Sequence, residues 1–432
     1  MSFRGKISVL VISGVIAIYA VVGGMLSPWT RAQQPINDST AQMRIFESVL
    51  GHIKNDYVDE PNLEKVRYGA LRGLVSGLDP YSSYLTPDQM KAYNSKVPSN
   101  KVGIGAEFSQ VSLYLYVVSV LKGSPAEKAG IKAGDVVEYI ENKATRDISL
   151  YDAKQLILGD TGSTVSLRIL RSAERPQTIK VVRGTTKTPA AESRMEAGKI
   201  GVIKVNSLET GEANDVKTQL QNLQKQGADK IVLDLRGVAT GTLDEAVATA
   251  NLFIKTGELA KVVGKDNVVK KTYTADASKA VFDGKLSVLI DLGTAGAGEA
   301  IAAAVLDKKR GEVVGERSFG AGTEQQLFPL SNGDGVLLTV SKWAAPNGTP
   351  FLGDDRATTG IKPSVEVKRP DTPAALEVDE LIDQKQQEEQ NPQATPSPTP
   401  APVKPKAVVQ EDIQLKKAIE ILQDKAQAAK AS

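Results

Sequence analysis

The chain has 432 residues, 41% of them hydrophobic, so it is long enough for more than one folded core. Lysine and arginine total 53 against 51 aspartate and glutamate residues, and this balance excludes the basic surplus typical of nucleic-acid binders. The absence of cysteine excludes disulfides, thiolate metal sites and a cysteine nucleophile. The single histidine, His52, lies in a predicted amphipathic helix and is interpreted as a surface residue. We expect neither a metal nor a cofactor.

Residues 1–34 predict a membrane-targeting segment. The stretch 7–26 is uncharged and almost wholly apolar, and it follows Arg4 and Lys6. Twenty residues at about 1.5 Å each span roughly a bilayer core. A positive flank before an apolar run indicates a signal peptide or a signal anchor, and the length of the run favours the anchor. We therefore expect the rest of the chain outside the cytoplasm, whether or not the segment is cleaved.

Residues 35–98 predict a helical segment. Apolar residues at spacings of three and four between Met43 and Tyr57 form one face of a helix. A second helix is expected to begin at Pro61 and to end before Tyr81. The segment either serves in oligomerisation, acts as a lid, or packs as an ordinary pair of helices.

Residues 99–185 change to the period of β-strands. Apolar residues alternate from Leu113 to Val120, and turn phrases rich in glycine follow this strand. A short helix from Ser149 to Leu158 opens with the capping pattern of Ser149 and Asp152. In this order the phrases resemble a PDZ domain, a module that binds a chain terminus by strand addition.

The resemblance to PDZ domains assigns the peptide-binding residues. It implies a carboxylate-binding loop formed by Val102, Gly103, Ile104 and Gly105. It also implies a groove lined by the helix between Leu150 and Leu158. The expected partners are unstructured polypeptide C-termini and not nucleic acid. The alternative is an idle groove, in a domain that serves as a spacer or a gate.

Residues 186–370 alternate apolar strands with helices. Strands are expected at 199–205 and 230–235, with helices at 211–226 and 242–255. This alternation predicts an α/β core built on a largely parallel sheet of βαβ units.

Sites in such sheets lie at the carboxyl ends of the strands, where two turns, 236–241 and 293–298, carry small residues. The second turn joins an apolar strand, 286–290, to an alanine-rich helix. This geometry can present a nucleophile, or a row of backbone amides that would hold a polypeptide.

The C-terminal part divides into two segments. Residues 371–406 lose all periodicity and include a proline-rich stretch, so they are expected to form an extended linker. Residues 407–432 include a predicted helix, 412–425, with Leu415 and Leu422 on its apolar side. This helix is expected to dock on the body of the protein or on a second subunit.

The whole arrangement resembles the carboxy-terminal processing peptidases, also called tail-specific proteases. The phrase GLDPYSSYL beginning at Gly77, the core phrase Asp234-Leu235-Arg236 and the phrase Gly360-Ile361-Lys362-Pro363 match those of the family. The resemblance implies a crotonase/ClpP-like α/β core with an inserted, mainly-β PDZ domain and helical segments at both ends. It also implies a place in the bacterial cell envelope, on the periplasmic side, either anchored in the inner membrane or secreted.

Members of that family cut polypeptide tails with a serine nucleophile, a lysine base and a glutamine. A serine hydroxyl needs a base to remove its proton, and lysine can serve only where burial lowers its pKa. The resemblance places the serine at Gly296, the lysine at Ala321 and the glutamine at Gln325. Gly296 has no hydroxyl and Ala321 has no amine. The oxyanion-hole turn of the family is also altered, to Val238-Ala239-Thr240-Gly241, which places the stabilisation of an oxyanion in doubt.

Three functions remain open from the sequence. In the first, the chain is a proteolytically inactive family member that binds polypeptide tails or regulates an active homologous peptidase. In the second, it is an active serine-type endopeptidase with non-standard residues, such as Thr294 or Ser318 with Lys308 or Lys309. The third reading is a structural subunit of an assembly, for example a homo-oligomer.

Overall fold

The computed structural model describes residues 39–95, 100–171, 174–355, 358–369 and 411–428. The expected targeting segment, 1–34, and the proline-rich linker, 371–406, lie outside the described residues. Within the described ranges, no helix has both the length and the apolar character needed to cross a membrane. Internal contacts divide the chain between Ala70 and Leu71 into two units, and each unit is described by itself.

Helix α2, Ser39–Asp56, is the main element of the first unit, as the helical spacing predicted. No residue of α2 is buried, and its large apolar side chains are exposed except for that of Ile53, which is half-buried. His52 lies on its surface, with Nδ1 at 2.6 Å from a carboxylate oxygen of Asp56. Helix α3, Leu63–Ser76, begins in this unit and continues into the second.

A six-stranded sheet forms the centre of the α/β core. Its strands are β8 (Glu192–Glu196), β9 (Ile200–Lys204), β10 (Lys230–Asp234), β13 (Lys285–Ile290), β14 (Glu312–Gly315) and β17 (Val365–Glu366). The order is β17-β14-β13-β10-β9-β8, and every neighbouring pair is parallel except β8 with β9. The prediction of a largely parallel sheet is therefore confirmed.

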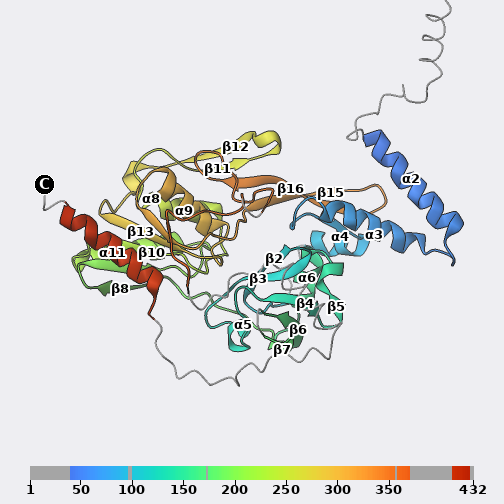
Figure 1. Cartoon of the computed structure of the whole chain (residues 1–432), viewed down its shortest axis with the longest axis horizontal. Coiled ribbons are helices and arrows are strands. Elements are labelled where there is room, and N and C mark those ends of the chain that lie inside the picture. Colours follow the sequence, from blue (N-terminus) through green and yellow to red (C-terminus); the bar gives the residue numbers. More distant parts are fainter. Residues whose placement is uncertain (1–38, 96–99, 172–173, 356–357, 370–410, 429–432) are drawn as a thin grey trace, which may run out of the picture. The chain divides into compact units, whose positions relative to one another are not determined.

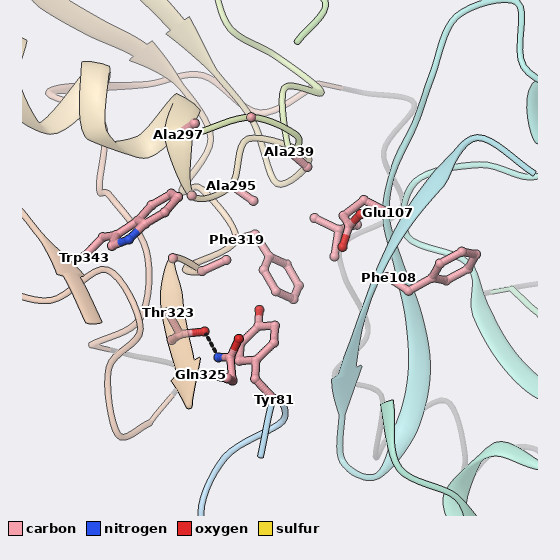
Figure 2. A pocket seen from close by; sticks show the side chains of 15 residues that line it. Tyr81, Glu107, Phe108, Ala239, Ala295, Ala297, Phe319, Thr323, Gln325 and Trp343 are labelled. Atoms are coloured by element: carbon pink, nitrogen blue, oxygen red, sulfur yellow. Dashed lines mark hydrogen bonds between the residues drawn. The ribbon is translucent and has the colours of Figure 1, made fainter. Parts of the chain in front are cut away.

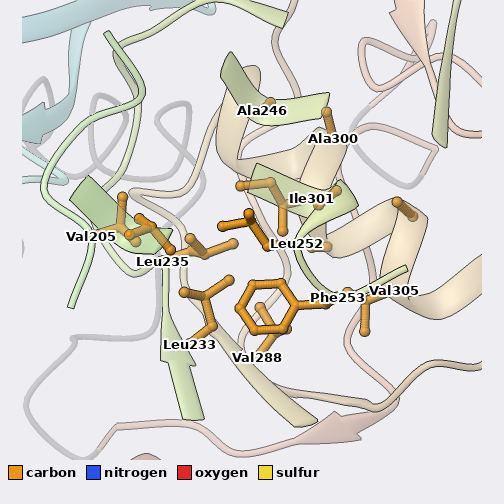
Figure 3. Packing of buried hydrophobic residues seen from close by; sticks show 14 of the residues in the cluster. Val205, Leu233, Leu235, Ala246, Leu252, Phe253, Val288, Ala300, Ile301 and Val305 are labelled. Atoms are coloured by element: carbon orange, nitrogen blue, oxygen red, sulfur yellow. The ribbon is translucent and has the colours of Figure 1, made fainter. Parts of the chain in front are cut away.

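Helices cover both faces of this sheet. On one face lie α7 (Glu212–Lys225), α8 (Leu243–Asn251) and α9 (Ala297–Asp307), and on the other lies α11 (Ile413–Ala428) (Figure 1). Figure 3 shows Leu233 and Val288 of the sheet among Phe253, Ile301 and Val305 on the first face. Because side chains alternate along a strand, a sheet buried on both faces needs apolar residues throughout its strands.

A second, antiparallel sheet was not predicted. It contains β1 (Ser83–Leu85), β11 (Glu258–Val263), β12 (Val269–Thr274), β15 (Thr323–Pro329) and β16 (Gly335–Ala344). The order is β1-β16-β11-β12, with β15 also paired to β16. Strand β1 corrects the expectation that residues 35–98 are helical throughout, because its three buried residues pair with 335–337. Helix α4, Pro87–Asn94, follows β1 behind a capping box at Thr86.

The PDZ segment forms its own six-stranded sheet around its own core. The strands are β2 (Ala106–Val111), β3 (Tyr114–Val120), β4 (Val136–Ile140), β5 (Lys143–Ala144), β6 (Thr164–Leu170) and β7 (Gln177–Val182). The helices are α5 (Pro125–Lys128) and α6 (Leu150–Ile157), and the predicted capping box of Ser149 and Asp152 is present. Short 3₁₀ turns are η2 (Thr145–Asp147) here, and η3 (Lys265–Asn267) and η4 (Ala277–Lys279) in the core.

Candidate functional site

The three positions assigned from the family pattern line one cavity of about 200 Å³ (Figure 2). Gly296 lies at the start of α9, Ala321 in the loop between β14 and β15, and Gln325 in β15. The other lining residues are Tyr81, Glu107, Phe108, Val118, Ala239, Gly241, Ala295, Ala297, Phe319, Gly322, Thr323 and Trp343. The structure thus brings together residues that the sequence separates by up to 262 positions, from Tyr81 to Trp343.

Gly296 has an unusual backbone conformation, with φ 51° and ψ −102°. An L-residue rarely adopts a positive φ, and strained positions of this kind typically present a nucleophile between a strand and a helix. A Cβ atom at Gly296 would lie 3.5 Å from Cζ3 of Trp343, which is an ordinary contact. The backbone therefore keeps the shape of a nucleophile turn while glycine removes both the side chain and the strain.

Most amides of this turn are bound within the protein, which departs from the expectation of a free row of amides. Four successive amides, from Gly293 to Gly296, donate within the protein. Their acceptors are the carboxylate and the carbonyl oxygen of Asp291, the carbonyl oxygen of Val238 and the carboxylate of Glu299. The strand–turn–helix geometry was predicted, but these partners come from other parts of the chain.

Glu299 is the buried residue that joins the two loops of the site. Its carboxylate accepts hydrogen bonds from the amides of Gly296 at 2.7 Å, Gly320 at 2.7 Å and Ala321 at 2.8 Å, and from Ser318 Oγ at 2.5 Å. Burial raises the pKa of the Glu299 carboxyl to about 7, although these four bonds act to lower it. The sequence signal was available, because a glutamate three residues after a helix cap is typical of a capping box.

Asp291 joins the same turn to the neighbouring one. One carboxylate oxygen accepts from the amides of Gly237 at 2.9 Å and Gly293 at 3.0 Å. The other lies 3.0 Å from the Arg369 guanidinium. Asp291 directly follows the apolar strand β13, so an acidic residue at a strand end was the signal for it. Together Asp291 and Glu299 hold three loops in place through bonds that involve only the backbone at positions 296 and 321.

Gln325 is oriented by a chain of hydroxyls. Its Nε2 donates to Thr323 Oγ1 at 2.7 Å (Figure 2) and to Thr339 Oγ1 at 3.3 Å. Thr339 in turn donates to Asp79 at 3.0 Å, which lies in the phrase GLDPYSSYL. The ring of Tyr81, from the same phrase, lines the cavity, and burial raises the pKa of its hydroxyl. This N-terminal phrase therefore forms part of the site.

The substitute nucleophiles considered from the sequence are buried. Thr294 Oγ1 donates to the Leu235 carbonyl at 3.0 Å, and Ser318 Oγ donates to Glu299; both side chains are fully buried and neither lines the cavity. Lys308 and Lys309 follow the far end of α9, an 11-residue helix about 16 Å long. These residues are not assembled into a nucleophile–base pair.

The lining of the cavity is small, aromatic and nearly uncharged. Among the described residues that line it, Glu107 is the single charged side chain, and there is no serine, lysine or histidine. The ring of Phe319 stacks on Tyr116 of the PDZ segment, with centroids 5.7 Å apart. Within the described ranges, no cluster of acidic or histidine side chains is suited to a metal ion. Such a cavity can hold an uncharged chain segment, and positions 296 and 321 contribute no hydroxyl and no amine to it.

The expected carboxylate loop of the PDZ domain is braced by backbone bonds. Val102 exchanges both of its backbone hydrogen bonds with Gly159 beyond α6. The carbonyl oxygens of Gly103, Ile104 and Gly105 accept from amides elsewhere in the domain. Gly105 has φ 75°, and a Cβ there would lie 2.4 Å from Ser124.

The side chains of Ile104 and Leu150 are buried in the PDZ core, and Leu158 caps the end of α6. One link joins β2 to α6, the expected walls of the groove, and a second joins β2 to the residue before the cap of α6. Lys154 Nζ lies 2.6 Å from Glu107, and Gln110 Nε2 donates to the Ile148 carbonyl at 2.9 Å. The peptide contacts assigned to residues 102–105, Leu150 and Leu158 stay predictions.

Comparison with known proteins bears on both parts of the molecule. Residues 199–367 match the model of peptidase family S41, and residues 116–171 match a PDZ domain. A probable CtpA-like serine protease of Staphylococcus haemolyticus (strain JCSC1435) is 33% identical over 368 residues, which are 84% of this chain and 72% of that protein. A protein of the same description from Staphylococcus aureus (strain MRSA252) is 32% identical over 369 residues, with the same coverage.

Among solved structures, the photosystem II D1 C-terminal processing protease is 26% identical with a TM-score of 0.63. The match covers 76% of this chain and 88% of that one. Fold, domain order and sequence similarity agree along most of the chain. The chain belongs to peptidase family S41, as a C-terminal processing peptidase homologue that carries a PDZ domain.

Proposed function

We propose that this protein binds polypeptide tails without cutting them. The observation that carries the proposal is the cavity at the family's catalytic positions, where Gly296 and Ala321 leave neither a nucleophile nor a base. The surrounding support is in place, since Glu299, Asp291 and Gln325 all hold their hydrogen-bond partners. A folded scaffold around an emptied centre suits recognition better than catalysis.

The ligand class follows from the PDZ domain and from the relatives. PDZ domains bind chain termini, and the D1 relative is named as a C-terminal processing protease. The cavity of this chain has a lining of glycine, alanine and aromatic residues, which can contact an extended chain closely. We therefore take an unstructured polypeptide C-terminus as the ligand.

The test is binding of a short fluorescent peptide that ends in an apolar residue, measured by anisotropy on the purified protein without residues 1–34. We expect binding to weaken about tenfold or more when the peptide carboxylate is amidated, because charge-assisted bonds to the loop are lost. The peptide should stay intact after prolonged incubation. Equal affinity for both peptides would contradict tail recognition, and cleavage would contradict the loss of activity.

A matched pair of variants tests where the carboxylate binds. Gly103→Asp places a negative charge in the expected loop, whereas Gly103→Asn has nearly the same shape without the charge. A Cβ at Gly103 approaches no atom more closely than 3.7 Å, so both variants should fold. We expect the aspartate variant to lose peptide binding and the asparagine variant to keep it. Equal affinities would place the carboxylate elsewhere.

The proposed setting is the extracytoplasmic side of a bacterial membrane, with the apolar run 7–26 as the anchor. In that setting the protein would present tails to an active homologous peptidase or withhold them from it. The test is to add this protein to such a peptidase and to measure the rate at which the peptidase cleaves a substrate that carries an unstructured C-terminal tail. A rate that does not depend on the added protein would argue against the regulatory role.

A further inference from the structure

The C-terminal helix α11 covers an apolar face of the core sheet. Ala418 and Leu422 of the helix are 0% and 3% exposed, and Leu415, Ile419 and Ile421 pack around them. The sheet residues beneath them are Ile200, Val202, Val232, Leu289 and Val314. Figure 1 shows α11 against β10 and β13, on the face opposite α8 and α9. Without the helix, this apolar surface would face solvent.

The start of α11 is bound to one arginine. The guanidinium of Arg236 forms a two-pronged pair with the carboxylate of Asp412, with both N–O distances 2.8 Å. Gln414, which is fully buried, accepts from the same guanidinium at 3.1 Å. Asp234 holds the other side of the guanidinium at 2.7 and 2.9 Å. Planar, two-pronged pairs of this kind fix geometry as well as charge.

Arg236 is also the first residue of the turn that lines the cavity. The turn continues through Gly237, whose amide donates to Asp291, to Ala239 and Gly241, which line the cavity. Lys204 holds the turn from the other side through the carbonyl oxygen of Arg236. The clamp on the Arg236 side chain therefore acts on the wall of the candidate site.

We infer that α11 is a tethered ligand of this sheet face, and that Asp412 and Gln414 are positioning residues that hold the cavity turn through Arg236. Residues 370–410 join the helix to the core. The described residues on either side of this connection lie close together, since Gln414 Nε2 donates to the Val367 carbonyl at 2.8 Å. A few residues at about 3.3 Å each would close this gap. The chain that joins Arg369 to Glu411 is therefore much longer than this gap requires.

This inference does not depend on tail binding, because its first test measures the turn itself. Hydrogen exchange of the amides in residues 236–242 is compared in Asp412→Ala and Glu411→Ala. Both variants remove one carboxylate, but Glu411 pairs with exposed Lys416 and not with Arg236. We expect exchange to be about tenfold faster in Asp412→Ala and unchanged in Glu411→Ala. Exchange in β10 should not change in either variant.

Equal exchange of residues 236–242 in the two variants would overturn the positioning role. Uniformly faster exchange across β10 as well would show general destabilisation and would also overturn it. Asp412→Glu, which keeps the charge, should recover part of the protection. A protein in which all three variants behave alike contradicts the inference.

The second test releases the helix from the intact chain. A specific protease sequence is placed between residues 371 and 406, the purified protein is cut, and the fragments are followed on dilution. We expect the helix to remain bound in concentrated protein and to dissociate on dilution. As it dissociates, hydrogen exchange of the amides in residues 236–242 should become faster. Dissociation with no change at the turn would overturn the inference. A dimer that requires Asp412 would also overturn it, by placing the helix on a second copy.

Discussion

Two buried carboxylates hold the shape of the candidate site. Glu299 accepts four hydrogen bonds, and Asp291 accepts from the two neighbouring turns. A buried carboxylate is costly unless it is hydrogen-bonded, so each of these groups needs its partners where they are. None of these bonds involves the side chain at position 296 or 321. The frame of the site therefore does not depend on the side chains at these two positions.

Restoring both lost side chains should create a peptidase from this frame. In Gly296→Ser/Ala321→Lys, the serine Cβ has room beside Trp343, at a backbone cost of about 1–3 kcal/mol for the positive φ. The lysine side chain would enter the cavity, where burial lowers its pKa towards that of a base. We expect the double variant to cleave an unfolded protein above background and each single variant to stay at background.

Cleavage is followed by gel electrophoresis and mass spectrometry of the fragments. Activity in either single variant would contradict the serine–lysine assignment of positions 296 and 321. A folded but inactive double variant would show that the altered turn 238–241 no longer supports an oxyanion.

Glu299 should make stability depend on pH. Its folded-state pKa, about 7, lies above the ordinary value of 4.5, so the folded protein binds the proton more tightly than the unfolded chain. This stabilising contribution is complete below about pH 4.5 and is lost as the pH rises through 7. The full shift corresponds to about 3 kcal/mol of unfolding free energy.

The measurement compares urea unfolding of the wild type and Glu299→Gln at pH 5 and pH 8. The NH₂ group of the glutamine would face the N–H and O–H donors that surround the carboxylate in the wild type. The variant should therefore be less stable by about 1–3 kcal/mol at pH 5. This difference should shrink by about 2–3 kcal/mol at pH 8. The matched control, Glu366→Gln, changes an exposed residue and should follow the wild type. A difference independent of pH would contradict the raised pKa.

At the scale of elements, α6 and β2 of the PDZ domain are linked across the expected groove. The pair of Lys154 and Glu107 is partly exposed, with 41% and 34% of the side chains accessible, so it contributes at most about 1 kcal/mol. A peptide that adds to β2 beside α6 must separate these side chains.

Breaking the link should favour the peptide. Lys154→Met keeps the apolar stem and removes the charge, so we expect tail affinity to rise by up to about fivefold. Lys128→Met, at the end of α5, makes the same change outside β2 and α6 and should leave affinity unaltered. Weaker binding in Lys154→Met would show that Lys154 contacts the tail itself.

At the scale of the whole molecule, the PDZ core and the α/β core, whose sequences differ in the spacing of their apolar residues, share one cavity. The PDZ core and the α/β core are built separately, but the cavity takes Glu107 and Val118 from one and Phe319 and Trp343 from the other. Ligands that enter the cavity therefore contact both parts. Tail binding and the state of the α/β core should be coupled for this reason.

At the same scale, the proposed membrane anchor would determine where the whole chain lies in the cell. Removal of residues 1–34 should move the protein from the membrane fraction to the soluble fraction of the expressing cell, because a long apolar run gives the main affinity for the bilayer. The shortened protein should stay in the cytoplasm, because the same run is the expected export signal. The measurement is fractionation with immunoblotting. Charged residues in place of two apolar ones within 7–26 should act in the same direction. Soluble full-length protein of unchanged mass would contradict anchoring.

The α/β core was predictable because its strands and helices carry strong local patterns. The apolar strands at 230–235 and 286–290 and the small-residue turn at 293–298 follow from period and composition alone. The antiparallel sheet was not predictable in this way. Its strand β1 is three residues long and pairs with residues 335–337, about 250 positions away, so its identity depends on the partner rather than on its own sequence.

The family, the order of the parts and the absence of a serine and a lysine at Gly296 and Ala321 follow from the amino-acid sequence, since these depend on residue types in a fixed order. Tertiary structure alone decided what replaces them. Glu299, Asp291 and Arg236 act through partners far along the chain, and no local period reports such partners. The turn that was expected to offer a row of free amides has four successive amides, from Gly293 to Gly296, bound internally for this reason. Burial and long-range hydrogen bonding are properties of the fold, not of any one segment.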